Sequence, residues 1–370
     1  MSRSPTTGPD GAPQRTGPFV LSVDAMGGDN GPKTVVAGMA KSAEKNPEIR
    51  FLLHGPAAEL KPLVEKRKLT DRVEIRDCPS TVSMDDKPSN VLRHGQDTSM
   101  WSCIEAVKNG EAEVAVSCGN TGALMLLSVM RLRKLPGVHR PAIACLWPSR
   151  NPSGFNVMLD VGADIKADPR DLLQYALMGC TYARNGQEVA RPRIGLLNNG
   201  TEEHKGRPEM KEAHALIAQA AGPVDFEFVG FVEGGDIPSD RVDVVVTDGF
   251  TGNIALKTGE GTAAFIRDAL REAFNHTPLS KLAAMLALTS LKRLQKRIDP
   301  RRVNGGVFLG LNGTVVKSHG SADDTGVSAA IKLAFKLAQK DFNTRLALRV
   351  ASADEVMAAA ASAPEMRSGT

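Results

Sequence analysis

Several apolar runs in the sequence end in short loops of glycine and small polar residues, and these loops hold the side chains best suited to chemistry. The loop SCGNTGA places Gly119 and Gly122 on either side of Asn120 and Thr121. Short polar side chains beside the first amides of a helix suit the stabilisation of an oxyanion. The alternative is that Asn120 or Thr121 simply caps the helix, which is the commoner role of these residue types.

A second glycine-rich loop, DAMGGDNGP, opens another expected helix. Its adjacent residues Gly27 and Gly28 let the backbone turn its N–H groups inward. Such a loop suits the binding of an anion at a helix N-terminus, with Asp24 and Asp29 on either side of the glycines. A tight turn from strand to helix explains the same residues, so both interpretations stay open.

Two further loops carry charged or amide side chains. The loop LNNGTEEHKG places Asn199 and Lys205 beside a flexible turn, which suits acid/base work or phosphate binding, although a solvated loop is equally compatible. The loop TDGFTGN contains Asp248 and Asn253, and Lys257 follows one helical turn later. A lysine at that place can reach an anion at the start of the helix as a point charge.

One histidine and one cysteine also lie in such loops. The loop KSHGSAD contains His319, the histidine best placed for catalysis, although a lone histidine is more often a structural hydrogen-bonding residue. Cys118 suggests a thiol nucleophile. No basic side chain lies near it in sequence, however, and a small buried cysteine is the commoner case.

The motifs that are absent narrow the chemistry. The sequence has neither the glycine-rich motifs of nucleotide and dinucleotide sites nor a G-x-S-x-G nucleophile elbow. No spacing of histidine, cysteine and carboxylate residues indicates a catalytic metal, so no metal or cofactor is expected. With 2 Trp, 2 Tyr and no long basic stripe, nucleic-acid binding is not expected either. The loops therefore indicate a site for inorganic phosphate or a phosphorylated group.

The composition is that of an ordinary soluble globular protein. Hydrophobic residues make up 42% of the 370 residues and charged residues 24%, with a net charge of +4. The 5 cysteines are widely spaced and form no C-x-x-C pair, which argues against a disulfide framework and favours a reducing compartment. No apolar stretch is long enough to span a bilayer and no secretory signal is evident, so a cytoplasmic location is expected.

The loops must be positioned by the elements between them. Short β-branched apolar runs alternate with longer helical periods, which predicts a mostly parallel sheet with helices on both faces, a Rossmann-like α/β fold that binds ligands at the carboxyl ends of its strands. The expected strands are Phe19–Val23, Arg50–His54, Val73–Arg76, Glu113–Ser117, Phe155–Val161, Ile194–Leu197, Asp225–Val229 and Val242–Thr247. The expected helices are Thr34–Lys45, Met100–Asn109, Gly122–Arg133, Pro169–Arg184, Pro208–Ala220, Asn253–Asn275 and Asp323–Arg345.

The two ends of the chain differ from its middle. Residues 1–18 are rich in proline and glycine and are predicted to be a disordered leader. Residues 19–345 are predicted to form the α/β domain, in which Gly306–Lys317 reads as a hairpin that turns at Asn312-Gly313. Residues 346–370 are assigned to an Ala-rich C-terminal tail, whose part after Ala351 is interpreted as a frayed helix.

A leucine-rich and basic segment, residues 277–302, concentrates the positive charge. Its first half is apolar and includes Leu286 and Leu288. Its second half is basic, with the candidate contact residues Lys292, Arg293, Lys296 and Arg297. A basic amphipathic helix is typical of a membrane-surface or acidic-partner segment, and the alternative is a helix in a dimer interface with a solvated basic end.

Taken in order, DAMGGD, SCGNTGAL, LDVGAD, LNNGTEEHKG, TDGFTGN and KSHGSAD resemble the signature blocks of the bacterial phosphate acyltransferase family of phospholipid synthesis, PlsX. The resemblance runs from about Phe19 to about Arg345, and six blocks in series make it specific. It implies an α/β fold similar to phosphotransacetylases and isopropylmalate dehydrogenases, and a homodimer. It also implies transfer of a fatty acyl group from acyl carrier protein to inorganic phosphate, which gives an acyl phosphate for a membrane glycerol-3-phosphate acyltransferase.

The resemblance suggests roles for the loops. The expected phosphate ligands are the Gly27-Gly28 loop, Lys205 and Lys257, the expected oxyanion donors are Asn120 and Thr121, and His319 is the expected proton donor or orienting group. The basic run from Lys292 to Arg302 is a candidate surface for the acidic carrier protein. The sequence departs from the family pattern at Cys118, where alanine is usual, at Gln96, where a basic residue is usual, and in its leader. Two alternatives stay open: a phosphotransacetylase acting on coenzyme A thioesters, and a non-catalytic membrane-associated scaffold that binds carrier protein.

Overall fold

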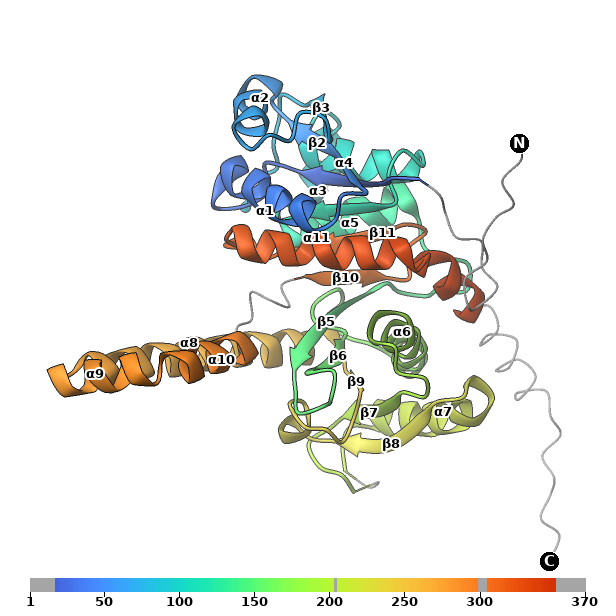
Figure 1. Cartoon of the computed structure of the whole chain (residues 1–370). Coiled ribbons are helices and arrows are strands. Elements are labelled where there is room, and N and C mark those ends of the chain that lie inside the picture. The colour runs from blue at the N-terminus through green and yellow to red at the C-terminus, as the bar shows by residue number, and fades with distance from the viewer. Residues whose placement is uncertain (1–16, 203–204, 299–304, 351–370) are drawn as a thin grey trace, which may run out of the picture.

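The apolar runs of the sequence become neighbouring strands of one eleven-stranded sheet (Figure 1). The computed structural model describes residues 17–202, 205–298 and 305–350. In spatial order the strands are β3 (Val73–Asp77), β2 (Ile49–Gly55), β1 (Phe19–Asp24), β4 (Val114–Ser117), β11 (Thr314–Lys317), β10 (Gly306–Leu309), β5 (Ala142–Pro148), β6 (Phe155–Leu159), β9 (Val244–Val246), β7 (Arg193–Leu197) and β8 (Glu227–Val232). All eight expected strands and the expected hairpin are present, with bounds that shift by a few residues.

The direction of the strands reverses in the middle of the sheet. From β3 to β11 every neighbouring pair is parallel, and so is every pair from β6 to β8. Between them, β10 is antiparallel to both β11 and β5, and β5 is antiparallel to β6. Two parallel blocks that point in opposite directions therefore meet at β10 and β5.

Helices cover both faces of the sheet because side chains alternate along its strands. Leu21 and Val23 of β1 pack in one core with residues of α1 and α11. Between them, Ser22 faces the other side, where its hydroxyl donates to the carbonyl oxygen of Cys103 in α4 over 2.8 Å. The helices are α1 (Gly31–Lys45), α2 (Ala57–Lys66), α3 (Pro88–His94), α4 (Ser99–Lys108), α5 (Thr121–Leu132), α6 (Pro169–Gln187), α7 (Pro208–Val224), α8 (Gly249–Asn275), α9 (Pro278–Leu286), α10 (Leu288–Ile298) and α11 (Asp324–Gln339), with a short 3-10 turn at Gly234–Asp236.

The sequence interpretation missed three elements and one boundary. Strand β5 and helices α2 and α3 were not expected. The last expected helix is interrupted after α11, and residues 342–350 are again helical. Leu346 and Val350 are buried in the core, so the packed chain extends beyond residue 345. Residues 1–16 of the expected leader and 351–370 of the expected tail lie outside the described residues.

Helix α8 leaves the sheet and continues, with α9 and α10, into an arm that projects from the body (Figure 1). The expected leucine-rich segment thus forms two helices that meet at Ala287 rather than one. Among its described residues, α9 has no buried side chain, and Leu286 at its end is 84% exposed. None of the described helices is both long enough and apolar enough to cross a membrane.

Candidate active site

The start of α5 is held in place by Asn120. Its side-chain Oδ1 accepts a hydrogen bond from the N–H of Ala123, so Asn120 is the N-cap of the helix. Its Nδ2 donates to the carbonyl oxygens of Met84 (2.8 Å) and Asp86 (3.1 Å). The capping alternative therefore describes this side chain, because its amide group is already engaged. Within the described residues, the N–H groups of Thr121 and Gly122 meet no protein acceptor, as is usual in a first helical turn.

The loop after β1 lies behind this helix start and supports it. Asp24 is 1% exposed and accepts hydrogen bonds from the hydroxyls of Ser99 and Ser117, both over 2.7 Å. Burial raises the pKa of its carboxyl group. Gly27 packs so closely on the next loop that a Cβ atom there would lie 2.5 Å from the amide nitrogen of Gly119. The Gly27-Gly28 loop therefore fixes the position of the Gly119 loop.

Lys317 is a buried lysine at the carboxyl end of β11. Its side chain is 9% exposed, and its Nζ donates to the carbonyl oxygens of Cys118, over 3.1 Å, and Ser318. Burial lowers its pKa to about 8, and the charge of Lys257 acts in the same direction. The Asp24 carboxylate opposes this shift. The amine is therefore mostly charged at neutral pH.

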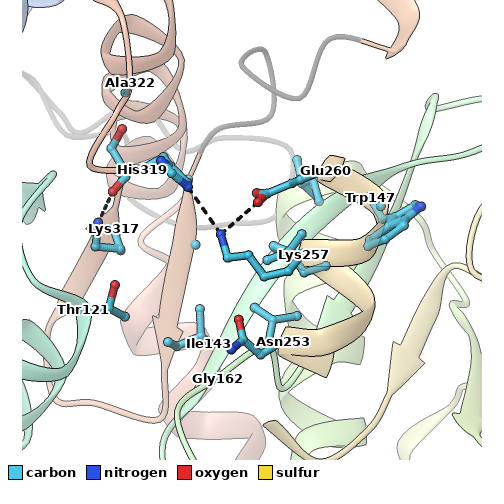
Figure 2. A pocket seen from close by; sticks show the side chains of 18 of the residues that line it. Thr121, Ile143, Trp147, Gly162, Asn253, Lys257, Glu260, Lys317, His319 and Ala322 are labelled. Carbon is cyan, nitrogen blue, oxygen red and sulfur yellow. Dashed lines mark hydrogen bonds and ion pairs between the residues drawn. The ribbon is translucent and has the colours of Figure 1, made fainter. Parts of the chain in front are cut away.

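His319 and Lys257 point toward one another across the site (Figure 2). The Nζ of Lys257 lies 3.3 Å from His319 Nε2 and 2.8 Å from a carboxylate oxygen of Glu260. Burial, and then the charge of Lys257, lowers the pKa of His319, so its ring is neutral at pH 7. Glu260 holds the lysine side chain extended toward the histidine.

The geometry around His319 favours an anion at this point. The N–H of Ser321 donates to His319 Nδ1 over 3.2 Å, and a backbone N–H can only donate. Ser321 Oγ also lies 2.9 Å from Nδ1, and the ammonium group of Lys257, which can only donate, lies at Nε2. A neutral ring accepts at one nitrogen only, so in either tautomer the Ser321 N–H or Lys257 faces a ring N–H. An acceptor atom with negative charge, such as a phosphate oxygen, would bind to the ammonium group of Lys257 beside the ring.

These groups line one end of a cavity of about 760 Å³. Thr121 and Gly122 contribute from α5, Lys317 and His319 from the end of β11, and Lys257 from α8. Most of the remaining lining is apolar and comes chiefly from β5 and α8, with Ile143, Leu146, Trp147, Pro148, Leu256 and Ala263. The cavity thus joins a cationic end to an apolar wall.

The loop after β6 forms another part of the cavity, around Gly162. Asp160, the first residue of the loop, is buried, and its Oδ1 accepts from the N–H of Ile143 (2.8 Å) and of Gly162 (3.2 Å). Burial raises its pKa to about 6. A Cβ on Gly252 would lie 1.9 Å from the carbonyl oxygen of Asp160, so glycine is required where α8 crosses this loop. Asp160 therefore contacts both the start of β5 and the start of α8.

The structure brings some of the expected site residues together and leaves others apart. Thr121, Gly122, Asn253, Lys257 and His319 line the cavity. Asp24, Gly27, Gly28, Asp29 and Gly119 lie in the supporting loops; Asp29, for example, donates from its N–H to the carbonyl oxygen of Gly320. Asp248 does not line the cavity either: it caps α8 through the N–H of Thr251 and forms an ion pair with Arg207.

Asn199 and Lys205 do not reach this cavity. They follow β7, which β9 separates from β6 in the sheet. The Nζ of Lys205 forms an exposed ion pair with Glu202 over 2.7 Å. Residues 203–204 of the same loop lie outside the described residues.

Sequence reasoning missed Lys317, Glu260 and the whole contribution of β5. A signal existed for Lys317, because this lysine directly continues the apolar run of Val315 and Val316, which the structure buries together with it. Burial also raises the pKa of Cys118, which argues against a thiolate there. Among the described residues, no group of histidine, cysteine and carboxylate side chains is arranged to hold a metal ion.

The candidate contact residues of the arm lie away from the cavity. Leu286 and Leu288 are exposed in α9 and α10, and so are Lys292 and Arg293. The side chains of Lys296 and Arg297 lie outside the described residues.

Comparison with known proteins relates the chain to others along almost its whole length. Residues 19–345 match the profile of a family described as "Fatty acid synthesis protein". A phosphate acyltransferase from Dinoroseobacter shibae is 72% identical over 365 residues, which are 98% of this chain and 94% of the relative. One from Paracoccus denitrificans is 72% identical over 333 residues, 90% of each chain.

A solved structure shares the fold. A phosphotransacetylase from Streptococcus pyogenes superposes with a TM-score of 0.58 at 17% identity, over 87% of this chain and 94% of that one. This likeness confirms the expected α/β fold class and its similarity to phosphotransacetylases. The expected similarity to isopropylmalate dehydrogenases stays a prediction.

Proposed function

Because this chain belongs to the fatty acid synthesis protein family, whose members compared above are phosphate acyltransferases, we propose that it transfers a fatty acyl group from acyl carrier protein to inorganic phosphate. The chain is thus an acyltransferase that acylates phosphate for lipid synthesis. The finer parts of the proposal are the carrier-protein donor and the use of the acyl phosphate by a membrane glycerol-3-phosphate acyltransferase. The observation that carries the proposal is the cavity, which places Lys257 and Lys317 beside an apolar wall.

The cationic end of the cavity suits phosphate. In the proposal, a phosphate oxygen accepts a hydrogen bond from Lys257 Nζ, His319 beside it orients the lysine and the phosphate, and the charge of Lys317 lies nearby. Phosphate is nucleophilic without an activating base, so these residues need only bind it and aim one oxygen at the carbonyl carbon. No thiol, triad or metal is required of the described residues for this step.

The start of α5 suits the carbonyl oxygen. Attack by phosphate on the thioester forms a C–O bond and places negative charge on the carbonyl oxygen. Thr121 and Gly122 line the same cavity at a helix N-terminus, and in the proposal their N–H groups donate to that oxygen. The C–S bond then breaks, the thiolate leaves with the electron pair, and the acyl phosphate remains. Asn120 acts by positioning these amides.

The second candidate is a phosphotransacetylase, acting on coenzyme A thioesters, since the superposed Streptococcus pyogenes protein is a phosphotransacetylase. The apolar wall of Leu146, Trp147 and Leu256 favours a long acyl chain over an acetyl group. Assay of acyl phosphate formation from palmitoyl-carrier protein, palmitoyl-coenzyme A and acetyl-coenzyme A separates the candidates. A higher kcat/KM for acetyl-coenzyme A than for either palmitoyl donor would contradict the proposal, and a scaffold would form no product.

Replacement of Lys257 tests the phosphate site. Lys257→Met removes one charge-assisted hydrogen bond to phosphate, which is worth about 1.5 to 3 kcal/mol, so kcat/KM for phosphate should fall about tenfold to about a hundredfold. The matched control is Lys332→Met, which removes an exposed lysine of α11 outside the cavity and should leave kcat/KM unchanged. Equal values for both variants would remove Lys257 from the phosphate site.

We further propose that the arm makes peripheral contact with a membrane through its exposed leucines, including Leu286 and Leu288. The adjacent exposed Lys292 and Arg293 would face anionic lipid headgroups or the acidic carrier protein. A homodimer is also proposed, on the resemblance alone.

A further inference from the structure

The cavity continues away from its cationic end as a groove between α8 and β5. One face of α8 lines it, with a residue at nearly every turn: Asn253, Leu256, Lys257, Gly259, Glu260, Ala263 and Arg267. The rise of an α-helix is about 1.5 Å per residue, so this row spans about 21 Å. We call this space the α8–β5 groove.

The character of the α8–β5 groove changes along its length. At one end, Lys257 faces His319, where the proposed reaction takes place (Figure 2). Further along, Trp147 of β5 and Ala263 of α8 line it. Glu260, which also lines this face, forms an ion pair with Lys257, and beyond Ala263 the next charged residue of the row is the exposed Arg267. An apolar segment is thus connected directly to the reacting end.

Gly259 lets α8 lie directly against the indole ring of Trp147. A Cβ on Gly259 would lie 2.4 Å and 2.7 Å from two atoms of that ring. The ring therefore lies against the helix backbone at this level, where both line the groove, and no larger residue fits at position 259 without moving the ring. Trp147 and Gly259 together set the width of the α8–β5 groove.

The length and polarity match one class of ligand. The hydrocarbon core of a bilayer is about 30 Å thick, so a single fatty acyl chain reaches about 15 Å. From Lys257 to Arg267 the α8–β5 groove spans about 15 Å, which is the length of such a chain, whereas an acetyl group would fill only its reacting end. A polar arm such as pantetheine would leave its amides without partners against Trp147, Pro148 and Ala263.

We propose that the acyl chain of the donor lies in the α8–β5 groove, with its carbonyl group at the start of α5 beside Lys257 and its methyl end past Ala263, and that Trp147 and Ala263 determine the preferred chain length. This inference rests on the proposed function and adds the residues that select the substrate. Each methylene group buried against these residues is worth about fourfold in affinity. Specificity then arises from how many methylenes the groove accepts.

Ala263→Trp tests the inference by filling the outer part of the groove. The variant is assayed for acyl phosphate formation with palmitoyl-carrier protein and octanoyl-carrier protein. Displacing only two methylenes of the longer chain should lower the palmitoyl-to-octanoyl ratio of kcat/KM about sixteenfold. The matched control is Ala264→Trp, which adds the same side chain at the adjacent, similarly half-buried position that does not line the groove. Its ratio should equal that of the wild type.

A second variant keeps the test independent of any folding defect. Trp147→Ala widens the groove and removes apolar contact, so it should change the same ratio by at least about fourfold, the value of one methylene. If both variants lose kcat/KM by the same factor with palmitoyl-carrier protein and with octanoyl-carrier protein, the inference is overturned. Such a result would indicate that the groove binds the carrier's pantetheine arm or only positions α8. Wild-type protein that forms no acyl phosphate from any donor would instead refute the proposed function, and this inference with it.

Discussion

Replacing Lys317 with methionine should change how the free energy of unfolding depends on pH, because burial in the folded protein disfavours the charged form of this lysine. Burial lowers its pKa from 10.5 to about 8. At about 1.4 kcal/mol for each pH unit, the charged form lowers the free energy of unfolding by about 3 kcal/mol at neutral pH. As pH rises above 8, the folded protein loses this proton before the unfolded chain does. The unfolded state then binds more protons, so stability rises with pH until about 10.5.

The readout is the difference in free energy of unfolding between wild type and Lys317→Met. Urea titrations at several pH values should show the wild type gaining about 2 kcal/mol relative to the variant between pH 7 and pH 9.5. The variant also leaves the carbonyl oxygens of Cys118 and Ser318 without the lysine donor, but that loss is constant with pH. Lys332→Met, at an exposed lysine of α11, is the control, and its free energy of unfolding should depend on pH as that of the wild type does. If the difference in free energy of unfolding between the wild type and Lys317→Met stays constant from pH 7 to pH 9.5, the reasoning is refuted.

Two other predictions concern the helix start and the arm. Asn120→Ala should lower the free energy of unfolding by about 1 kcal/mol, because the N-cap of α5 is lost, and it should reduce kcat, because the first amides of α5 shift. Asn120→Asp keeps an N-cap and should lose less stability. Thermal unfolding and steady-state kinetics of both variants provide the measurement. The double variant Leu286→Glu, Leu288→Glu should lower co-sedimentation with anionic vesicles at least tenfold. Thr289→Glu, Ser290→Glu, which adds the same charge at neighbouring exposed positions, should lower it less. Equal vesicle binding by the two double variants would remove the leucines from the membrane contact.

The fold could be predicted from the sequence where a strand is followed by a helix. Eight strands fit that alternation, because strands covered on both faces appear as continuous apolar runs. Strand β5 has the same apolar signal in AIACLW, but it is followed by the antiparallel strand β6 and so breaks the alternation. Helix α2 contains Pro62, which conceals its helical pattern. The missed elements are those whose identity depends on a partner distant in sequence.

The candidate site could be predicted only in part, because the sequence locates strand ends but not which ends meet. The loops after β4 and β11 do meet, since these two strands are parallel neighbours with Lys317 opposite Ser117. The loop with Lys205 follows β7, and the order β6, β9, β7 carries it away from the cavity. The apolar wall escaped notice because it belongs to β5. The sequence therefore indicates which side chains could take part in chemistry more readily than it indicates which strand pairings bring them together.

Helix α8 connects the two ends of the proposed pathway. Lys257 and Ala263, at the reacting end and in the apolar part of the α8–β5 groove, lie on the same continuous helix that leads into the arm with its exposed leucines. An acyl phosphate formed at Lys257 would therefore have its hydrocarbon chain directed toward the part of the protein proposed to touch the membrane. If the acyl phosphate passes to a membrane enzyme, as proposed, its chain would then avoid exposure to water. This coupling would account for a helix pair with exposed leucines that projects from the sheet, and it requires that both the chain-length and the vesicle experiments succeed.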